Sequence, residues 1–252
     1  MDVTLVIPAF NERENLPPLV AACRAALDGY EGSHEIVLID DGSTDGSSGL
    51  IDDLIRQLEI LRPIRHPPGQ NIGCHPSELE GLKVARGDVA LFLPADLQIH
   101  PSVLPAFVEA SAGADVVASR RVLRADARWR RHLSAVNNRV ERRLLGVDVH
   151  DAHSSMLLTR KAIDAVVPRI VSRSALIPAE ILVRAARLGL SIGEIDVEHR
   201  PRTAGTQTGA RLAEILAVQV DLLRLRAMLR REARREAREA AARASSRPAV
   251  DE

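Results

Sequence analysis

Residues 3–8 read VTLVIP, a run of apolar and β-branched residues that ends at a proline. A short run of this kind, without polar alternation, is typical of a strand buried on both faces of a parallel sheet. Two similar runs follow, EIVLI at 35–39 and VALFL at 89–93, and segments with helical spacing of apolar residues separate the three. This alternation predicts a mainly parallel α/β sheet with helices on both faces, a three-layer Rossmann-like arrangement.

Outward from these strands, two further strands are expected at 114–119 and 190–199. Apolar stripes predict helices over 16–27 and 50–58 and a shorter helix around Leu79 and Leu82, and Asn11 is a candidate cap for the first helix. Ligands bind at the carboxyl ends of strands in such sheets. We therefore expect the site in the loops after residues 7, 39, 93 and 118.

The composition is that of a globular protein, with 46% hydrophobic and 27% charged residues among 252. Lys plus Arg and Asp plus Glu both total 34, so the net charge indicates no polyanionic partner, and 2% aromatic residues disfavour stacking on nucleic acid. Two cysteines provide no disulfide framework. Since the sequence shows neither a signal peptide nor 18 consecutive apolar residues, we expect a cytoplasmic protein.

Carboxylates follow the second strand in DDGSTD, residues 40–45. Asp40 or Asp41 is placed to accept a hydrogen bond from a nucleobase N–H or a ribose hydroxyl. The alternative is a turn in which Ser43 or Asp45 caps the next helix. The residues leave both interpretations open.

The third strand continues into PADLQIHP, where Asp96 and Gln98 stand two residues apart. Both side chains offer oxygen ligands for a divalent cation that bridges the two phosphates of a nucleotide-sugar. Pro94 offers none. The alternative role for Asp96 is to cap a helix that begins near Pro101.

Together, VIPAFNERENL, EIVLIDDGSTDGS, the stretch from NIGCHPSELEG to PADLQIHP, and VVASRR make the sequence resemble the family 2 glycosyltransferases of GT-A fold, over about residues 1–210. Within them it is most similar to the dolichol- or polyprenyl-phosphate sugar synthases. The resemblance implies an inverting transferase that uses a nucleotide-diphosphate sugar, linked to UDP or GDP, and a divalent cation, Mg²⁺ or Mn²⁺.

The resemblance also implies roles for individual residues. Pro8, Phe10 and Glu12 would line the nucleotide, Asp40 or Asp41 would contact the base or ribose, and Asp96 and Gln98 would fall at metal positions. The family usually has DAD where this chain has PAD, so the first metal carboxylate is missing.

The residues that the resemblance implies for acceptor binding lie in later segments of the sequence. WRRHLS, with Arg130 and Ser134, resembles the segment that meets the acceptor phosphate in the lipid-phosphate branch. RPRTAG resembles a loop whose arginine, here Arg202, clamps phosphates, a task that suits its planar guanidinium. Asp151 stands where relatives with hydroxyl acceptors have a general base. For each arginine the alternative is a solvated surface side chain.

We therefore expect transfer of a sugar to a polyprenyl phosphate. Two alternatives remain: a soluble hydroxyl acceptor with Asp151 as base, and a protein that binds a nucleotide-sugar without turnover. The histidine pair in HDAH, 150–153, does not by itself predict zinc.

Residues 211–252 are expected to form a separate helix, first amphipathic and then rich in Arg and Ala. From Leu212 to Leu229 leucines and other apolar residues recur every three or four positions, which predicts packing or a homodimer. Residues 224–243 carry eight Arg and three Glu. This end lacks the apolar face of an interfacial helix, so two interpretations stay open: a solvated helix, or peripheral contact with an anionic membrane.

Overall fold

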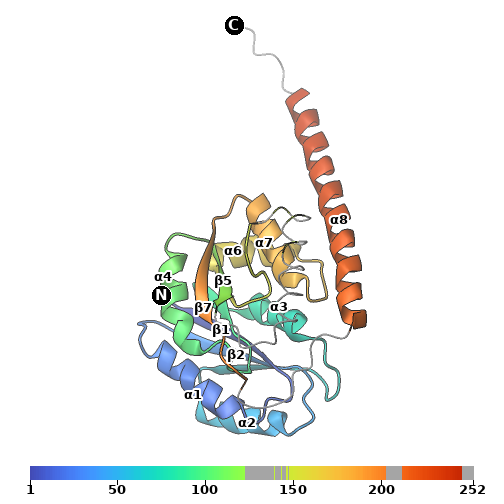
Figure 1. Cartoon of the computed structure of the whole chain (residues 1–252). Helices are drawn as coiled ribbons and strands as arrows, with labels where there is room; N and C mark the ends of the chain where they lie inside the picture. The colour runs from blue at the N-terminus through green and yellow to red at the C-terminus, as the bar shows by residue number, and fades with distance from the viewer. Residues whose placement is uncertain (123–138, 140–142, 144–145, 147, 203–211, 246–252) are drawn as a thin grey trace. The chain divides into compact units, whose positions relative to one another are not determined.

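The computed structural model of the chain describes residues 1–122, 139, 143, 146, 148–202 and 212–245 (Figure 1). Two compact units make up the chain, residues 1–209 and 210–252. The first carries the sheet and the candidate site. The second carries one long helix, α8 (Leu212–Ser245). No helix in the described part of the chain is both long enough and apolar enough to span a bilayer.

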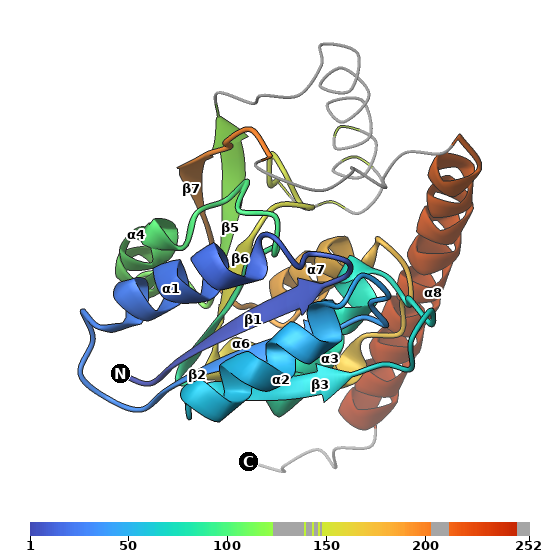
Figure 2. The same cartoon turned by 90° about the horizontal axis from the view of Figure 1, so that it is seen from below.

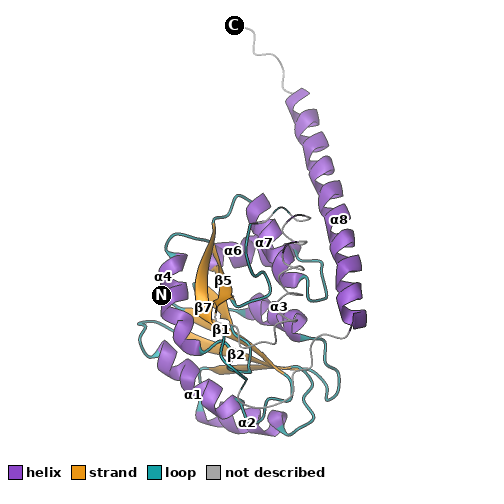
Figure 3. Cartoon of the chain, viewed as in Figure 1, coloured by secondary structure: helices purple, strands orange, loops and turns teal. Residues whose placement is uncertain are grey.

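The first unit alternates strands and helices, as Figure 3 shows. Its elements are, in chain order, β1 (Val3–Ala9), α1 (Leu16–Leu27), β2 (His34–Asp40), α2 (Ser47–Gln57), β3 (Leu61–Arg65), α3 (Cys74–Val84), β4 (Val89–Phe92), η1 (Pro101–Val103), α4 (Leu104–Ser111), β5 (Val116–Val122), β6 (Met156–Thr159), α6 (Arg160–Val166), η2 (Val167–Arg169), α7 (Ile177–Arg187) and β7 (Ile192–Glu198).

The strands form one sheet in the order β3-β2-β1-β4-β6-β5-β7. β1 pairs in parallel with β2 and with β4, and β2 pairs in parallel with β3. β6 runs antiparallel to both of its neighbours, and β5 pairs in parallel with β7. The expectation of a mainly parallel sheet is confirmed.

Helices cover both faces of the sheet, which gives three layers (Figure 2). Side chains of α1, α2 and α4 pack with Leu5 and Ile7 of β1, whereas α3, α6 and α7 pack with Val6 on the opposite face. This split follows from the strand period of two, which sends successive side chains to opposite faces. The central strands β1, β2 and β4 contribute apolar side chains to both cores.

Two strands were missed from the sequence, β3 and β6. β3 contains Pro63, which argues against a central strand, but β3 lies at the edge of the sheet, where a missing N–H is tolerated. β6 is four residues long, too short to show a period. The helices α6 and α7 were also not assigned.

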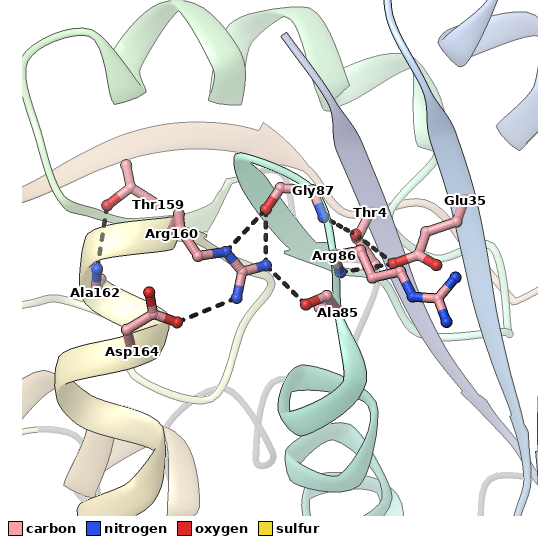
Figure 4. A network of polar contacts seen from close by, with 9 residues as sticks. All are labelled: Thr4, Glu35, Ala85, Arg86, Gly87, Thr159, Arg160, Ala162 and Asp164. Atoms are coloured by element: carbon pink, nitrogen blue, oxygen red, sulfur yellow. Dashed lines mark hydrogen bonds and ion pairs between the residues drawn. The ribbon is translucent and has the colours of Figure 1, made fainter.

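A polar network fixes the turn between α3 and β4 (Figure 4). The Gly87 N–H donates to Thr4 Oγ1 at 2.9 Å, Thr4 Oγ1 donates to Glu35 Oε1 at 2.9 Å, and the Arg86 N–H donates to the same oxygen at 2.7 Å. The Arg160 guanidinium donates to the carbonyl oxygens of Ala85 and Gly87. The network thereby sets the register of β4, whose far end delivers Asp96.

Candidate active site

The loop after β1 and the turn after β2 are joined by four hydrogen bonds. The Asn11 N–H donates to Ser43 Oγ, the Glu12 N–H to Ser47 Oγ, the Arg13 N–H to Asp45 Oδ2, and the Thr44 N–H to Asn11 Oδ1. Asn11 has φ +56°, a left-handed conformation that asparagine tolerates. The prediction that Asn11 caps α1 is wrong: the cap position is Asn15, and the Asn11 side chain binds the neighbouring turn instead.

The two aspartates of DDGSTD have different surroundings, although each is 2% exposed. Asp40 accepts hydrogen bonds from the Ser43 N–H and from Ser48 Oγ, so it holds its own turn together. Asp41 accepts from the N–H groups of Ile72 and Gly73, both at 2.9 Å, and so fixes the loop before α3. Asp45 accepts from the Ser47 N–H at the start of α2, but the cap position of α2 is Gly46, so the prediction that Ser43 or Asp45 caps this helix is wrong.

The loop after β3 approaches this turn closely at Gly42. Gly42 has φ +78°, and a Cβ there would lie 2.7 Å from Pro67 O and 2.9 Å from Gln70 N. The Gly69 N–H donates to Gly42 O at 2.8 Å. Only glycine fits this position, both for its φ and for the backbone contact.

Asp96 and Gln98 diverge because Leu97 between them has φ +59°. Asp96 Oδ1 accepts from the Gln98 N–H at 3.0 Å, whereas the Gln98 amide donates to Arg200 O at 3.4 Å. The helical turn at Pro101 is capped by His100, which accepts from the Ser102 N–H, so the capping alternative for Asp96 is wrong.

Arg202 lies between two carboxylates of the site. Its guanidinium forms an ion pair with Glu12, and its Nη1 lies 3.7 Å from Asp96 Oδ2. Burial raises the pKa of Glu12, and nearby Asp96 acts in the same direction, against hydrogen bonds from Asn15 and Arg202 that lower it. An arginine held by two carboxylates is positioned to exchange one of them for a phosphate.

A cavity of about 310 Å³ opens where these loops meet. Its size suits a small-molecule ligand. It is lined by Pro8, Ala9, Phe10, Asn11, Glu12, Asp41, Asn71, Gly73, Cys74, Pro94, Ala95, Asp96 and Arg202.

Six of the predicted site residues therefore line one cavity: Pro8, Phe10, Glu12, Asp41, Asp96 and Arg202. Asp40 and Gln98 are not among the described residues that line it. Asp151 is 5% exposed and accepts from Arg121 Nε at 2.7 Å and Nη2 at 3.0 Å, and it does not line the cavity either. Arg130 and Ser134 lie outside the described residues.

The sequence reasoning missed one wall of the cavity, formed by Asn71, Gly73 and Cys74. This wall follows β3, and because β3 was not recognised, its loop was not among those expected to form the site. The signal that could have found it is IRHPPGQNIG, an apolar residue followed by turn residues and a glycine just before a helix.

The two histidines of HDAH have separate partners. His150 Nδ1 lies 2.6 Å from Glu194 Oε2, whereas the ring of His153 lies 5.9 Å from that of His75, centroid to centroid. Across the described residues, no three His, Cys, Asp or Glu side chains are arranged to hold a metal ion.

Among curated proteins, the chain is similar to undecaprenyl-phosphate 4-deoxy-4-formamido-L-arabinose transferases. It is 33% identical to the one from Shewanella sediminis over 208 residues, which are 81% of this chain and 60% of the relative. It is 35% identical to the one from Pseudomonas paraeruginosa over 206 residues, 81% of this chain and 59% of the relative. The chain thus spans about three fifths of the length of these relatives.

Among solved structures, the fold matches glucosyl-3-phosphoglycerate synthase from Mycobacterium tuberculosis, crystallised with Mn²⁺, UDP and phosphoglyceric acid. The TM-score is 0.66 at 20% identity, over 89% of this chain and 78% of the synthase. This likeness shows the GT-A fold. The family model described as glycosyl transferase family 2 matches residues 4–167, which include Glu12, Asp41 and Asp96. The chain therefore belongs to glycosyl transferase family 2.

Proposed function

We propose that the protein is an inverting glycosyltransferase that moves a sugar from a nucleotide-diphosphate sugar to a polyprenyl phosphate. The observation that carries the proposal is the convergence of Asp41, Asp96 and Arg202 on one cavity at the carboxyl edge of the sheet. Asp41 would face the nucleoside, and Arg202 would face the diphosphate. The names of the similar transferases support the acceptor class.

In this proposal the acceptor phosphate oxygen attacks the anomeric carbon from the face opposite the leaving group. The bond between that carbon and the β-phosphate oxygen breaks, and its electron pair leaves with the nucleoside diphosphate. Arg202 neutralises the charge that develops there, after it releases Glu12 or Asp96. A phosphate acceptor is already ionised at neutral pH, so no general base is required, which agrees with the pairing of Asp151 to Arg121.

Among the carboxylates of the cavity, we propose that Asp96 is the one that would bind a divalent cation. Asp96 Oδ2 lies 3.7 Å from Arg202 Nη1, beyond hydrogen-bond distance, whereas both Asp41 oxygens accept backbone N–H groups. Asp96 would therefore hold the cation as a single protein carboxylate, and diphosphate oxygens would supply the remainder, as is common for Mg²⁺. When bound, the cation would add positive charge at the leaving diphosphate.

A lipid-phosphate acceptor places the reaction at a membrane surface. We propose that the protein works in the cytoplasm, at the inner face of the membrane, and that the arginines of α8 contact anionic lipid there. A homodimer through the apolar positions of α8 also remains a prediction, which sedimentation equilibrium would test.

The first experiment is calorimetric titration of UDP and of GDP, each with Mg²⁺, with Mn²⁺ and with EDTA. We expect one nucleotide to bind, and we expect the Asp96→Asn variant to lose the part of the affinity that depends on the cation. Asp53→Asn is the matched control, because Asp53 is an exposed carboxylate of α2 that pairs with Arg56. Failure of both nucleotides to bind would overturn the donor site.

Turnover is measured separately, as transfer of radiolabelled sugar from a nucleotide-diphosphate sugar to undecaprenyl phosphate in detergent micelles. Transfer to the lipid supports the proposal. Nucleotide binding without transfer to any phosphate or hydroxyl acceptor would instead identify a protein that binds nucleotide-sugars and does not turn them over.

A further inference from the structure

His66 follows β3 and bridges two carboxylates. Its Nδ1 lies 2.7 Å from Asp41 Oδ1, and its Nε2 lies 2.8 Å from Glu80 Oε2. The His66 side chain is 12% exposed and Asp41 is almost fully buried, whereas Glu80 on α3 is 41% exposed. The imidazole therefore connects the wall of the candidate nucleotide cavity to a helix surface outside it.

The two contacts require both ring nitrogens to donate, since carboxylates only accept. Only the protonated ring has two N–H groups. A neutral ring would direct a lone pair at one carboxylate, and either Asp41 or Glu80 would have to turn away. Asp41 cannot turn without also releasing the N–H groups of Ile72 and Gly73, so its position, the loop before α3 and the shape of the cavity change together.

The surrounding charges favour the protonated ring. Burial acts to lower the pKa of His66, but the hydrogen bonds and charges of Glu80 and Asp41 prevail and raise it. From β3 itself, Arg65 turns to Asp52 of α2, with Nη2 2.6 Å from Oδ1. From β2, the Asp40 carboxylate is engaged by Ser43 and Ser48. Asp41 and Glu80 are thus the charged groups that face the ring among the described residues.

We propose that His66 is a positioning residue for the donor: in its doubly bonded form it holds Asp41 in place for the nucleoside, so that its proton is coupled to nucleotide affinity. The inference rests on the proposed function, since it takes the ligand of the cavity to be a nucleoside diphosphate. Because the folded protein favours the protonated ring, nucleotide affinity is full below the usual pKa of histidine and falls as pH rises through the higher pKa of folded His66.

The test is titration of UDP and GDP between pH 6 and 9.5 at fixed Mg²⁺, with NMR titration of the imidazole in parallel. We expect affinity to fall roughly tenfold across the titration of His66, the equivalent of about one hydrogen bond. The NMR midpoint of His66, assigned by its absence in His66→Gln, should coincide with the binding midpoint.

Glu80→Gln is the decisive variant, because this substitution removes only a charge. The Glu80 side chain is 41% exposed and lies outside the cavity. The variant should move both midpoints to lower pH by about one unit, while the affinity at pH 6 stays within about twofold of wild type. His66→Gln should bind with no midpoint in this range. Glu194→Gln is the matched control, since Glu194 faces His150, another histidine, away from the cavity. It should leave the binding midpoint unchanged.

The outcomes separate the two proposals. If wild type binds a nucleotide but the midpoint does not move in Glu80→Gln, or if the binding and NMR midpoints differ, the role of His66 is overturned and the donor site stands. If wild type binds neither nucleotide at any pH, the proposed function is overturned, and the role of His66 with it.

Discussion

At the scale of single residues, the site depends on backbone conformations that sequence patterns do not reveal. The sequence predicted that Asp96 and Gln98, two residues apart, both offer oxygen ligands to one cation. The left-handed Leu97 directs them to different partners, and leucine gives no signal of a positive φ. In contrast, residue chemistry singled out Asp41 and Asp96, the family resemblance added Glu12 and Arg202, and all four line one cavity.

Arg202 provides the prediction at this scale. Arg202→Gln would leave Glu12 buried without its cation and would remove the positive charge at the leaving diphosphate. We expect transfer to fall by about 10²–10³-fold in kcat, measured as sugar transferred to undecaprenyl phosphate. Arg200→Gln is the control, because Arg200 is exposed and pairs with Glu198. An exposed pair contributes little, so its rate should change by less than about threefold. Equal losses in the two variants would contradict the role of Arg202.

At the scale of elements, the central strands β1, β2 and β4 and the edge strand β7 were predictable, whereas β3, β6 and the helices α6 and α7 were missed. β1, β2 and β4 are continuous apolar runs, so their pattern alone assigns them. β6 joins the sheet through tertiary pairing with β4 and β5. Its four residues are too few to predict that pairing from their pattern. Because β3 was missed, the loop after it was not predicted to line the cavity. An error in assigning one strand therefore led to an error in predicting the site.

The packing of α3 on the sheet gives a prediction about stability. A Cβ at Gly81 would lie 2.3 Å from Val6 Cγ1 and 3.0 Å from Ile39 Cδ1, inside a buried core. Gly81→Ala should lower the free energy of unfolding by about 1–2 kcal/mol, since the overpacking exceeds the gain in helix propensity. Gly49→Ala on α2 is the control, with no atom within 4 Å of its Cβ. It should raise stability by up to about 1 kcal/mol. Urea denaturation measures both, and destabilisation by Gly49→Ala but not by Gly81→Ala would refute the packing argument.

At the scale of the whole molecule, the charge distribution matters more than the net charge. Lys plus Arg equals Asp plus Glu over the chain, yet the second half of α8 is strongly basic. This basic segment could be recognised from the sequence alone, because its composition is read without any knowledge of the fold. The change in pattern near residue 210 also predicts a separate C-terminal helical segment, and this domain boundary stays a prediction. What the sequence could not supply is the partner of the α8 apolar positions, since a heptad-like spacing suits several partners.

The prediction at this scale concerns lipid. Replacing Arg230, Arg231, Arg234 and Arg235 with Gln should weaken binding to vesicles that contain phosphatidylglycerol by at least tenfold at low salt, because each basic residue near the surface contributes about 1 kcal/mol. Vesicle co-sedimentation measures the change, and binding of wild type should itself fall as salt rises. Vesicles of phosphatidylcholine alone are the control for nonspecific adsorption. Undiminished binding of the variant to anionic vesicles would exclude α8 as the contact.

The close approach at Gly42 has a consequence for evolution of this site. Two backbones touch there, so the spacing between the turn after β2 and the loop after β3 is set by the absence of a side chain. Substitution of cavity residues such as Phe10 or Asn71 could change which base fits, one side chain at a time. A substitution at Gly42 would move the entire 66–73 loop, and with it every contact of Asp41 to that loop. If the proposed nucleotide site is correct, substitutions of side chains that line the cavity can change its donor preference, but the distance between these two loops stays fixed by Gly42.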